Sequence, residues 1–424
     1  MIVMDKLVVV GGHRLKGSVR ISGSKNAVLP MMASTLLAEG EYTVQNVPVL
    51  RDVHTMVHLL QSIGAKVEFQ DHVLKMDTTS CSSFEAPYNL VKTMRASIYV
   101  LGPLVGRFGY GKVALPGGCA WGPRPVNLHI EGLKKLGAQI TIENGYIVAK
   151  AKRLKGTTIF FDIPSVGATG NLLMAAVLAK GTTVIANAAK EPEIVSLAQF
   201  LQSMGASIDG MGTNRLEIHG VDSLHPASAT VIPDRIEAGT FLVAGHITGG
   251  DVLLEGVHPD HLAALLDKLK ESGAEIEEGR DFIRIQSPGE ITPVNVTTDV
   301  YPGFPTDMQA QWMALMSVAK GTSRVTDTVF LDRFTHVAEL QRFGADITLD
   351  HNVAVIKGIP RLLGAPVMST DLRASASLIL AGLVARGRSD ISRVYHIDRG
   401  YERIEEKLKT LGAEIWRDRE ELVT

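Results

Sequence analysis

The chain has 424 residues, more than one hydrophobic core usually supports, so two or three domains are expected. Its net charge of -2 gives no electrostatic footprint for nucleic acid or an anionic membrane, and 45% hydrophobic and 21% charged residues are typical of a globular protein. The two cysteines, Cys81 and Cys119, argue against a disulfide framework, and the apolar run near the N-terminus is too short for a signal sequence or a membrane span. We therefore expect a cytoplasmic protein.

One sequence unit recurs six times along the chain. In each copy an amphipathic helical pattern ends in Gly-Ala and continues into residues with β propensity, as in LLQSIGAKVEF. Glycine at this place favours the left-handed conformation that ends a helix. Successive glycines are 73, 68, 68, 71 and 68 residues apart. The six glycines are Gly64, Gly137, Gly205, Gly273, Gly344 and Gly412.

A second, more apolar helix is predicted upstream of each copy. The clearest cases run from Ser165 to Gly181 and from Thr306 to Gly321. Their apolar residues lie nearly all round the helix, which indicates that these helices are buried. Several units close with two short strands, and the Asn144-Gly145 pair predicts a type I′ hairpin. The other buried helices are expected to begin at Ser24, Thr93, Asp234 and Asp371.

The repeated unit is therefore strand, helix, strand, helix and hairpin, a βαβαββ-type unit. Six such units predict an α/β fold of two domains with three units and pseudo-threefold symmetry in each. We expect one domain at residues 23–232 and a second at residues 1–22 with 233–424. Helix N-termini carry partial positive charge and free N–H groups that bind anions. Converging N-termini in two opposed domains would make a cleft suited to a polyanionic ligand.

Charged side chains gather at the predicted starts of the buried helices. Arginine binds phosphate and carboxylate with two parallel hydrogen bonds, and lysine acts as a point charge. A capping role at these places would favour Asp or Glu, so the cations indicate a site for phosphates and carboxylates. The alternative for each single residue is a solvated charge or a helix cap. The residues are Lys25 with Asn26, Arg95, Asp234 with Arg235, Asp307, Asp371 with Arg373, and Arg399 further on.

A loop rich in glycine and proline surrounds Cys119, with the sequence PGGCAWGPRP at residues 116–125. This composition excludes a helix or an interior strand, and the length is typical of a lid. Arg124 lies five residues after Cys119 and favours its thiolate, so a reactive cysteine is physically reasonable. The alternative is a buried, inert cysteine. No GxSxG, HExxH or CxxC string occurs and the histidines show no ligand spacing, so we expect no metal and no cofactor.

Eight segments together resemble the UDP-N-acetylglucosamine 1-carboxyvinyltransferase family, and the likeness covers essentially the whole chain. They are ISGSKNA, LPGGCAWGPRPVNLHI, SVGAT, EPEIV, PDRIEAGTFLVA, FPTDMQAQ, DLRASASL and YHIDRGYERIE. The resemblance implies two inside-out α/β barrel domains of three repeats each, in agreement with the six repeats. It implies transfer of the enolpyruvyl group of phosphoenolpyruvate to the 3-hydroxyl of UDP-N-acetylglucosamine with release of phosphate, the first committed step of peptidoglycan precursor synthesis. The partners it implies are these two small molecules, without nucleic acid or membrane.

The same resemblance implies roles for individual residues. Cys119 would be the general acid that protonates the methylene carbon of phosphoenolpyruvate, and Asp307 the base near the sugar hydroxyl. Lys25, Arg124 and Arg399 would hold the phosphate and carboxylate of phosphoenolpyruvate. The implied catalytic residues are Cys119, Asp307, Lys25 and Arg399. The implied substrate-binding residues are Lys25, Asn26, Arg95, Arg124, Pro125, Val126, Asn127, Leu128, Ser165, Val166, Gly167, Asp307, Val329, Arg333, Asp371 and Arg373.

Two departures and three alternatives accompany this interpretation. Many family members carry Asp where this chain has Asn127, and Lys near the position of Ile163. The second change removes one possible cation from the diphosphate. The first alternative is 5-enolpyruvylshikimate-3-phosphate synthase, with the same fold and donor, against which the Cys119 loop argues. The others are a paralogue that binds UDP-N-acetylglucosamine without turnover, and a cysteine hydrolase, which would need a histidine paired with Cys119.

Overall fold

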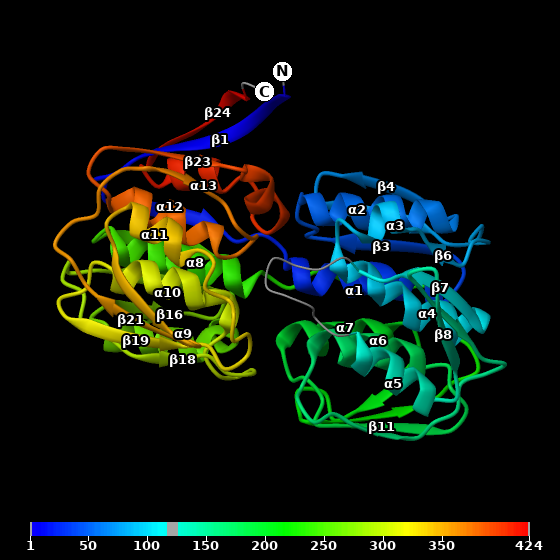
Figure 1. The fold of residues 1–424 in the computed structure, drawn as a ribbon. Helices are drawn as coiled ribbons and strands as arrows, with labels where there is room; N and C mark the ends of the chain where they lie inside the picture. Colours follow the sequence, from blue (N-terminus) through cyan, green and yellow to red (C-terminus); the bar gives the residue numbers. More distant parts are fainter. Residues whose placement is uncertain (1, 117–125, 423–424) are drawn as a thin grey trace. The chain divides into compact units, whose positions relative to one another are not determined.

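The computed structural model describes residues 2–116 and 126–422. Cys119, Arg124 and Pro125 of the predicted site lie outside the described residues. The described chain separates into two compact units (Figure 1). One contains residues 23–116 and 126–232 and is called the 23–232 unit below. The other contains residues 2–22 and 233–422 and is called the 233–422 unit.

The 23–232 unit is built on three four-stranded sheets. The first has the order β14 (Ser228–Thr230), β3 (Glu41–Gln45), β5 (Val73–Asp77), β4 (Lys66–Gln70). The second has the order β6 (Glu85–Ala86), β7 (Tyr110–Ala114), β9 (Tyr146–Lys150), β8 (Gln139–Glu143). The third has the order β10 (Thr158–Phe160), β11 (Thr182–Ala186), β13 (Arg215–His219), β12 (Ser207–Asp209).

The 233–422 unit repeats this plan with three further four-stranded sheets. The first has the order β2 (Lys16–Arg20), β15 (Asp251–Glu255), β17 (Phe282–Gln286), β16 (Glu275–Glu278). The second has the order β18 (Val296–Thr297), β19 (Thr322–Thr326), β21 (Val353–Lys357), β20 (Asp346–Asp350). The third has the order β22 (Pro366–Met368), β23 (Arg388–Ser392), β1 (Ile2–Val10), β24 (Glu414–Leu422).

Each sheet starts with one parallel pair and continues with two antiparallel pairs, for example β10 parallel to β11 and β11 antiparallel to β13. In four sheets the parallel pair is a local crossover through a helix. In the other two the first strand comes from a distant part of the chain, because β14 pairs with β3 and β2 pairs with β15. Strand β1 likewise completes the last sheet between β23 and β24. The chain passes from one unit to the other twice, and these pairings between distant strands complete the sheets of both units.

Two sets of helices pack on these sheets. The more buried set consists of α1 (Lys25–Ser34), α4 (Leu101–Phe108), α6 (Val166–Ala176), α8 (Arg235–Ile247), α10 (Gln309–Met316) and α12 (Ser375–Val384). The second set, one after each buried helix, consists of α2 (Arg51–Ile63), α5 (Asn127–Lys135), α7 (Pro192–Ser203), α9 (Ala263–Glu271), α11 (Val337–Arg342) and α13 (Ile404–Thr410). The remaining helical structure of the described residues consists of the single turn α3 (Tyr88–Val91) and 3₁₀ segments at Thr35–Leu37, Arg95–Val100, Pro259–Leu262, Thr306–Met308 and Val394–Arg399.

The predicted repeat is confirmed in all six copies. The glycine after each helix of the second set has a positive φ, between 90° and 112°. Asn144 and Gly145 have φ of 50° and 80°, so the hairpin between β8 and β9 turns as its sequence predicts. Each unit has its own apolar core, and the buried helices contribute side chains with almost no exposed surface, such as Trp312 on α10. In the described part of the chain, no helix is long and apolar enough to cross a bilayer.

Two predicted helices end earlier than their sequences indicated. Helix α6 stops at Ala176 rather than at Gly181, and α10 stops at Met316 rather than at Gly321. The residues that follow use their backbone groups elsewhere, since the N–H of Lys180 donates to Leu154 O at 2.8 Å and that of Lys320 to Ile291 O at 2.9 Å. These bonds lead the chain into the next strand, so apolar composition alone overestimated the helix length.

Candidate active site

The N-termini of the three buried helices meet on one face of the 233–422 unit. Asp234 is the N-cap residue of α8 and accepts from the N–H groups of Ile236 and Glu237 at 2.9 and 3.0 Å. Arg373, just before α12, places its Nη2 2.9 Å from Asp234 Oδ2. Its Nε lies 3.8 Å from Asp307 Oδ2, in the 3₁₀ turn Thr306–Met308 that leads into α10. One guanidinium therefore joins all three helix starts.

Asp307 is held mainly by Arg333, a buried arginine in the loop after β19. Arg333 Nη1 lies 2.6 Å from Asp307 Oδ1 and also donates to Thr306 Oγ1 at 3.2 Å. The Asp307 side chain remains 27% exposed, whereas that of Arg333 is only 6% exposed. The carboxylate is thus fixed from the protein side and still open to a ligand. Two guanidinium groups thus lie within 4 Å of this carboxylate.

Asp327, which sequence reasoning missed, connects this turn to its sheet. Its Oδ2 accepts from Thr306 Oγ1 at 2.7 Å, and its Oδ1 accepts from the N–H groups of Val329 and Phe330 at 3.0 and 2.8 Å. A fully buried carboxylate that receives several hydrogen bonds fixes the loop that carries it. Asp327 therefore sets the positions of both Val329 and the Asp307 turn. Its sequence signal is weak, because it is one more polar residue directly after β19, whose sequence Thr-Ser-Arg-Val-Thr is itself mostly polar.

Asp371 shapes the start of α12. It accepts from the N–H groups of Arg373 at 2.7 Å and Ala374 at 3.1 Å, as a capping residue does. Burial raises the pKa of Asp371, and the charge of Arg333 partly opposes this rise. The predicted residues Asp307, Arg333, Asp371 and Arg373 are therefore neighbours.

A second network lies behind Arg373. Its Nη1 donates to Gly400 O at 2.9 Å, and its guanidinium carbon lies 5.2 Å from the centre of the Tyr401 ring. The Tyr401 hydroxyl contacts Thr240 Oγ1 at 2.9 Å and accepts from Gln311 Nε2 at 3.2 Å. Arg399 is half-buried in the 3₁₀ turn Val394–Arg399, next to the carbonyl that Arg373 holds. The structure thus links Arg399 to the Arg373 cluster through Gly400.

Both arginines of this cluster are stabilised in their charged form. Burial alone would lower the pKa of Arg373, but the charges of Asp234 and Asp307 outweigh it and the pKa is raised. The pKa of Arg333 is raised in the same way, with Asp307 and Asp371 as the main opposing charges. Buried guanidinium groups paired in this way stay charged and can attract an anionic ligand.

In the 23–232 unit the predicted cation Lys25 is paired. Lys25 is the first residue of α1 and is only 7% exposed. Its Nζ lies 2.8 Å from Oδ2 of Asp52, a buried carboxylate in the first turn of α2 that sequence reasoning missed. Asn26 is half-buried beside it. The pair holds the ammonium group at the helix start, where helix dipole and lysine charge both favour an anion.

His129 connects further predicted residues of this unit. It is buried near the start of α5, and its Nδ1 lies 2.9 Å from Asn171 Nδ2 on α6. Burial lowers the pKa of His129 to about 4, with a smaller contribution from the charge of Arg95. A Cβ built on Gly167 would lie 3.3 Å from His129 Nε2, so the first turn of α6 packs directly against the ring. Arg95, His129 and Gly167 therefore lie close together.

The remaining predicted residues of this unit lie at two helix starts. Ser165 is the N-cap residue of α6 and accepts from Ala168 N at 3.3 Å, and Val166 opens the helix. Val126 and Leu128 are half-buried at the start of α5, while Asn127 between them is exposed. Lys25 and Arg95 also lie at helix starts, so this unit has polar side chains and backbone N–H groups at several helix N-termini.

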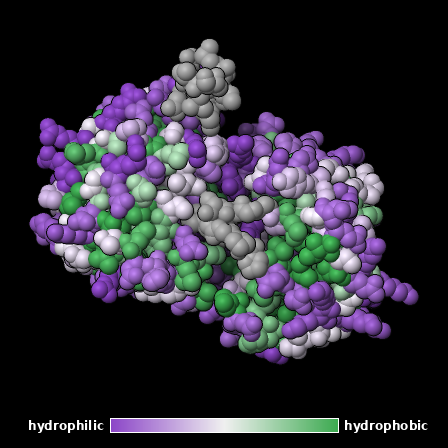
Figure 2. Space-filling view, viewed as in Figure 1, coloured by the Kyte–Doolittle hydropathy of each residue, from purple (hydrophilic) through white to green (hydrophobic). Residues whose placement is uncertain are grey.

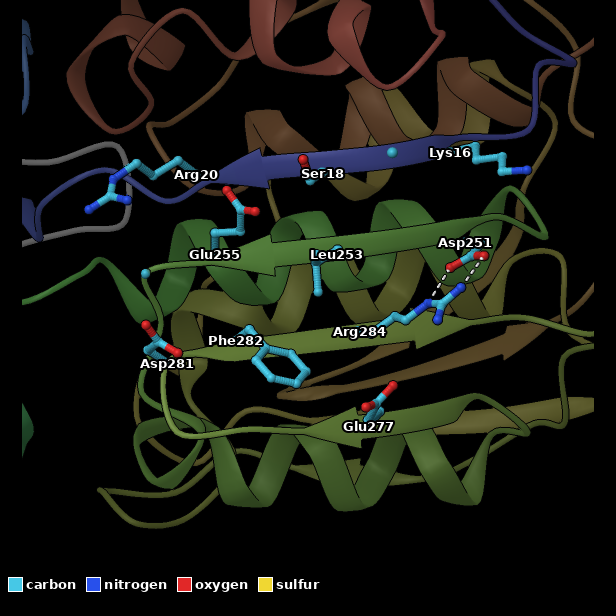
Figure 3. A pocket seen from close by; sticks show the side chains of 12 residues that line it. Lys16, Ser18, Arg20, Asp251, Leu253, Glu255, Glu277, Asp281, Phe282 and Arg284 are labelled. Carbon is cyan, nitrogen blue, oxygen red and sulfur yellow. Dashed lines mark hydrogen bonds and ion pairs between the residues drawn. The ribbon is translucent and has the colours of Figure 1, made fainter.

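A groove lies elsewhere on the 233–422 unit. It measures about 800 Å³ and follows the outer face of the sheet formed by β2, β15, β17 and β16. Figure 3 shows Leu253 and Phe282 at its centre and the ion pair between Arg284 and Asp251 at one end. None of the described residues predicted for the site lines this groove. Within the described ranges, no group of three or more His, Cys, Asp or Glu residues could hold a metal ion.

The chain is similar to known proteins over nearly its whole length. The family model described as EPSP synthase (3-phosphoshikimate 1-carboxyvinyltransferase) matches residues 9–408. The crystal structure of the enolpyruvyl transferase NikO from Streptomyces tendae superposes with a TM-score of 0.89 at 26% identity, over 99% of this chain and 100% of that one. EPSP synthase from Acinetobacter baumannii has the same fold, with a TM-score of 0.76 at 19% identity over 98% of this chain and 100% of that one. The fold is thus that of the carboxyvinyl transferases.

Curated relatives define the family more narrowly. A UDP-N-acetylglucosamine 1-carboxyvinyltransferase of Chloroherpeton thalassium is 59% identical over 98% of this chain and 97% of its own length. One of Thermodesulfovibrio yellowstonii is 57% identical over 98% of this chain and its full length. The chain belongs to the UDP-N-acetylglucosamine 1-carboxyvinyltransferase family. The predicted family and fold are confirmed.

Proposed function

We propose that the protein transfers the enolpyruvyl group of phosphoenolpyruvate to the 3-hydroxyl of UDP-N-acetylglucosamine and releases phosphate. The observation that carries this proposal is the identity of 59% over nearly the full length of a relative with that activity in its name. The helix starts and paired cations of both units support it, because both substrates are polyanions. We propose the 23–232 unit and the 233–422 unit as the two substrate-binding domains.

The 23–232 unit is proposed to bind the sugar nucleotide. Asn26, Arg95 and the starts of α5 and α6 would contact it, and the N–H groups at these starts suit its diphosphate. Val329 and Asp307 of the 233–422 unit would contact its sugar part. Ile163 is 70% exposed and carries no charge, so diphosphate binding would depend on Arg95 and on backbone N–H groups.

Phosphoenolpyruvate is proposed to bind to Lys25, Arg124 and Arg399. Its phosphate and carboxylate carry several negative charges, which match one ammonium and two guanidinium groups. Arg333, Asp371 and Arg373 would support this arrangement from the cluster described above. The pair of Lys25 with Asp52 positions the ammonium group, and a bound anion adds a second favourable partner.

The reaction is proposed to proceed by addition and elimination. Cys119 donates a proton to the methylene carbon of phosphoenolpyruvate, and the sugar 3-oxygen adds to the neighbouring carbon while its own proton passes to Asp307. The resulting intermediate carries both the sugar and the phosphate on one carbon. The Cys119 thiolate left by the first step then takes a proton from the new methyl group while phosphate departs, and the double bond is restored. The Asp307 carboxylate is held by Arg333 and is 27% exposed, so it is proposed as the group that accepts the hydroxyl proton.

The product itself tests the proposal. Purified protein is incubated with phosphoenolpyruvate and UDP-N-acetylglucosamine, and the sugar nucleotide is analysed by proton NMR. Two vinyl protons on a group attached at the sugar 3-position are expected. A sugar nucleotide that binds but returns unchanged would favour the non-catalytic paralogue.

We further propose a cytoplasmic location without nucleic-acid or membrane partners, supported by the net charge of -2.

A further inference from the structure

Arg417 on β24 forms a branched set of ion pairs within the 233–422 unit. Its Nη2 and Nη1 lie 2.6 and 3.0 Å from the two carboxylate oxygens of Asp398, a bidentate arrangement. Its Nε donates to Glu405 on α13 at 2.8 Å, and Nη1 also reaches Asp5 on β1 at 3.3 Å. One guanidinium thus joins two strands, a helix and the 3₁₀ turn Val394–Arg399.

Asp398 is the residue directly before Arg399. On the other side of Arg399, the carbonyl of Gly400 accepts from Arg373 at 2.9 Å. The two backbone neighbours of Arg399 are therefore held by two different arginines. A Cβ on Gly400 would lie 2.8 Å from a methyl carbon of Leu372, so the chain at Gly400 has little room to shift.

The support behind Arg417 is rigid. Strand β24 pairs with β1 along nine consecutive residues, with Arg417 opposite Leu7. Figure 1 shows the two strands side by side. The Arg417 side chain is 29% exposed and that of Glu405 only 6%, so this contact is shielded from solvent compared with most surface ion pairs. Because β24 is fixed in register, Arg417 holds Asp398 in place through their two hydrogen bonds, and Asp398 in turn restrains its neighbour Arg399.

We infer that Arg417 is a positioning residue for Arg399, holding it through Asp398 at the place where it meets phosphoenolpyruvate. This inference rests on the proposed function. A guanidinium binds a phosphate or carboxylate well only when its planar fork meets the oxygens in the correct geometry. A displacement of about 1 Å at such a group can cost on the order of 100-fold in rate. Supporting residues are therefore part of an anion site.

A matched control exists on another sheet of the same unit. Arg284 forms a similar bidentate pair with Asp251, with distances of 2.9 and 2.8 Å and side chains 42% and 31% exposed. This pair lies in the groove of Figure 3, on the outer face of its sheet. None of the described site residues lines that groove. Removing the Arg284 pair tests what the loss of an ion pair does by itself.

The kinetic test compares Arg417→Gln, Arg417→Lys and the control Arg284→Gln. In Arg417→Gln the KM for phosphoenolpyruvate is expected to rise about tenfold, while the KM for UDP-N-acetylglucosamine changes less than about twofold. Arg417→Lys keeps the charge and should recover part of the loss, because lysine supplies one of the two bonds to Asp398. Arg284→Gln should leave both KM values unchanged. Equal effects of Arg417→Gln and Arg284→Gln on phosphoenolpyruvate would overturn the inference.

Amide hydrogen exchange separates this inference from the proposed function. Residues 394–401 are expected to exchange about tenfold faster in Arg417→Gln than in the unchanged protein, and at the same rate in Arg284→Gln. If the unchanged protein has no turnover, the proposed function fails, yet faster exchange in this segment would still support the restraint by Arg417. Unchanged exchange in Arg417→Gln would contradict it, whatever the activity.

Discussion

The contact between Asp234 and Arg373 gives the sharpest test of the cluster at the helix starts. Their side chains are only 4% and 2% exposed, with Nη2 to Oδ2 at 2.9 Å. Asp234→Asn should preserve the helix cap, because asparagine caps helices as well as aspartate does. It removes the buried negative charge that compensates Arg373. Breaking such a pair from one side costs about 3 kcal/mol, because the remaining buried charge is poorly compensated.

Urea unfolding of the purified variants, followed by circular dichroism, measures this cost. With a slope of about 3 kcal/mol per molar urea for a unit of this size, the midpoint for the 233–422 unit should fall by about 1 M. Asp234→Ala also removes the cap and should cost about 1 kcal/mol more. The double variant Asp234→Asn/Arg373→Met should be more stable than the sum of its single changes predicts, since both charges are gone. A midpoint shift below about 0.2 M in Asp234→Asn would refute the reasoning.

Three further predictions concern the cysteines and a buried histidine. Cys119→Ala should lose nearly all turnover and still bind UDP-N-acetylglucosamine in calorimetry. Cys119→Asp should retain turnover with its optimum at lower pH. Full turnover in Cys119→Ala would contradict the acid role. Fosfomycin, which resembles phosphoenolpyruvate, should label Cys119 and spare Cys81, because Cys81 is half-buried and burial raises its pKa. Peptide mass spectrometry that finds the label only on Cys81 would contradict this prediction. Burial lowers the pKa of His246 to about 4, against about 6.5 in an unfolded chain, so between these values only the unfolded state binds the proton. The free energy of unfolding should therefore fall by up to about 3 kcal/mol as the pH drops from about 6.5 to 4. In His246→Leu, unfolding measured at several pH values should show a weaker dependence of this free energy on pH. An unchanged dependence would exclude His246 as its source.

The repeat could be predicted from the sequence because it depends on local signals. Each helix of the second set ends at a glycine, such as Gly137, which adopts a positive φ without help from contacts with distant parts of the chain. The buried helices were predictable for the same reason, since their composition is apolar all round. Their ends were not, because the last turn of α6 is decided by a hydrogen bond from Lys180 to Leu154, more than twenty residues away in the chain.

The site shows the same division. Lys25, Asp307 and Arg373 stand out at helix starts, and the sequence resemblance assigns them without the structure. Their partners do not stand out, because Asp52 and Asp327 occupy ordinary positions in a first helix turn and after a strand. Only the fold brings Asp52 to within 2.8 Å of Lys25. Pairings between distant parts of the chain depend on tertiary packing, which local patterns do not encode.

Figure 2 shows hydrophilic and hydrophobic residues interspersed over the face in view. Among the described residues, the large apolar side chains that are well exposed come from separate elements, such as Ile142 on β8 and Leu363 after β21. Scattered exposed apolar residues are normal for a protein surface and do not define a docking site.

Phosphate release from phosphoenolpyruvate, measured with two acceptors, tests the central claim most directly. The protein is supplied with UDP-N-acetylglucosamine in one reaction and with shikimate 3-phosphate in the other. Release only with UDP-N-acetylglucosamine is the expected result, in keeping with the relatives at 57% and 59% identity. Release only with shikimate 3-phosphate would keep the fold and contradict the proposed acceptor.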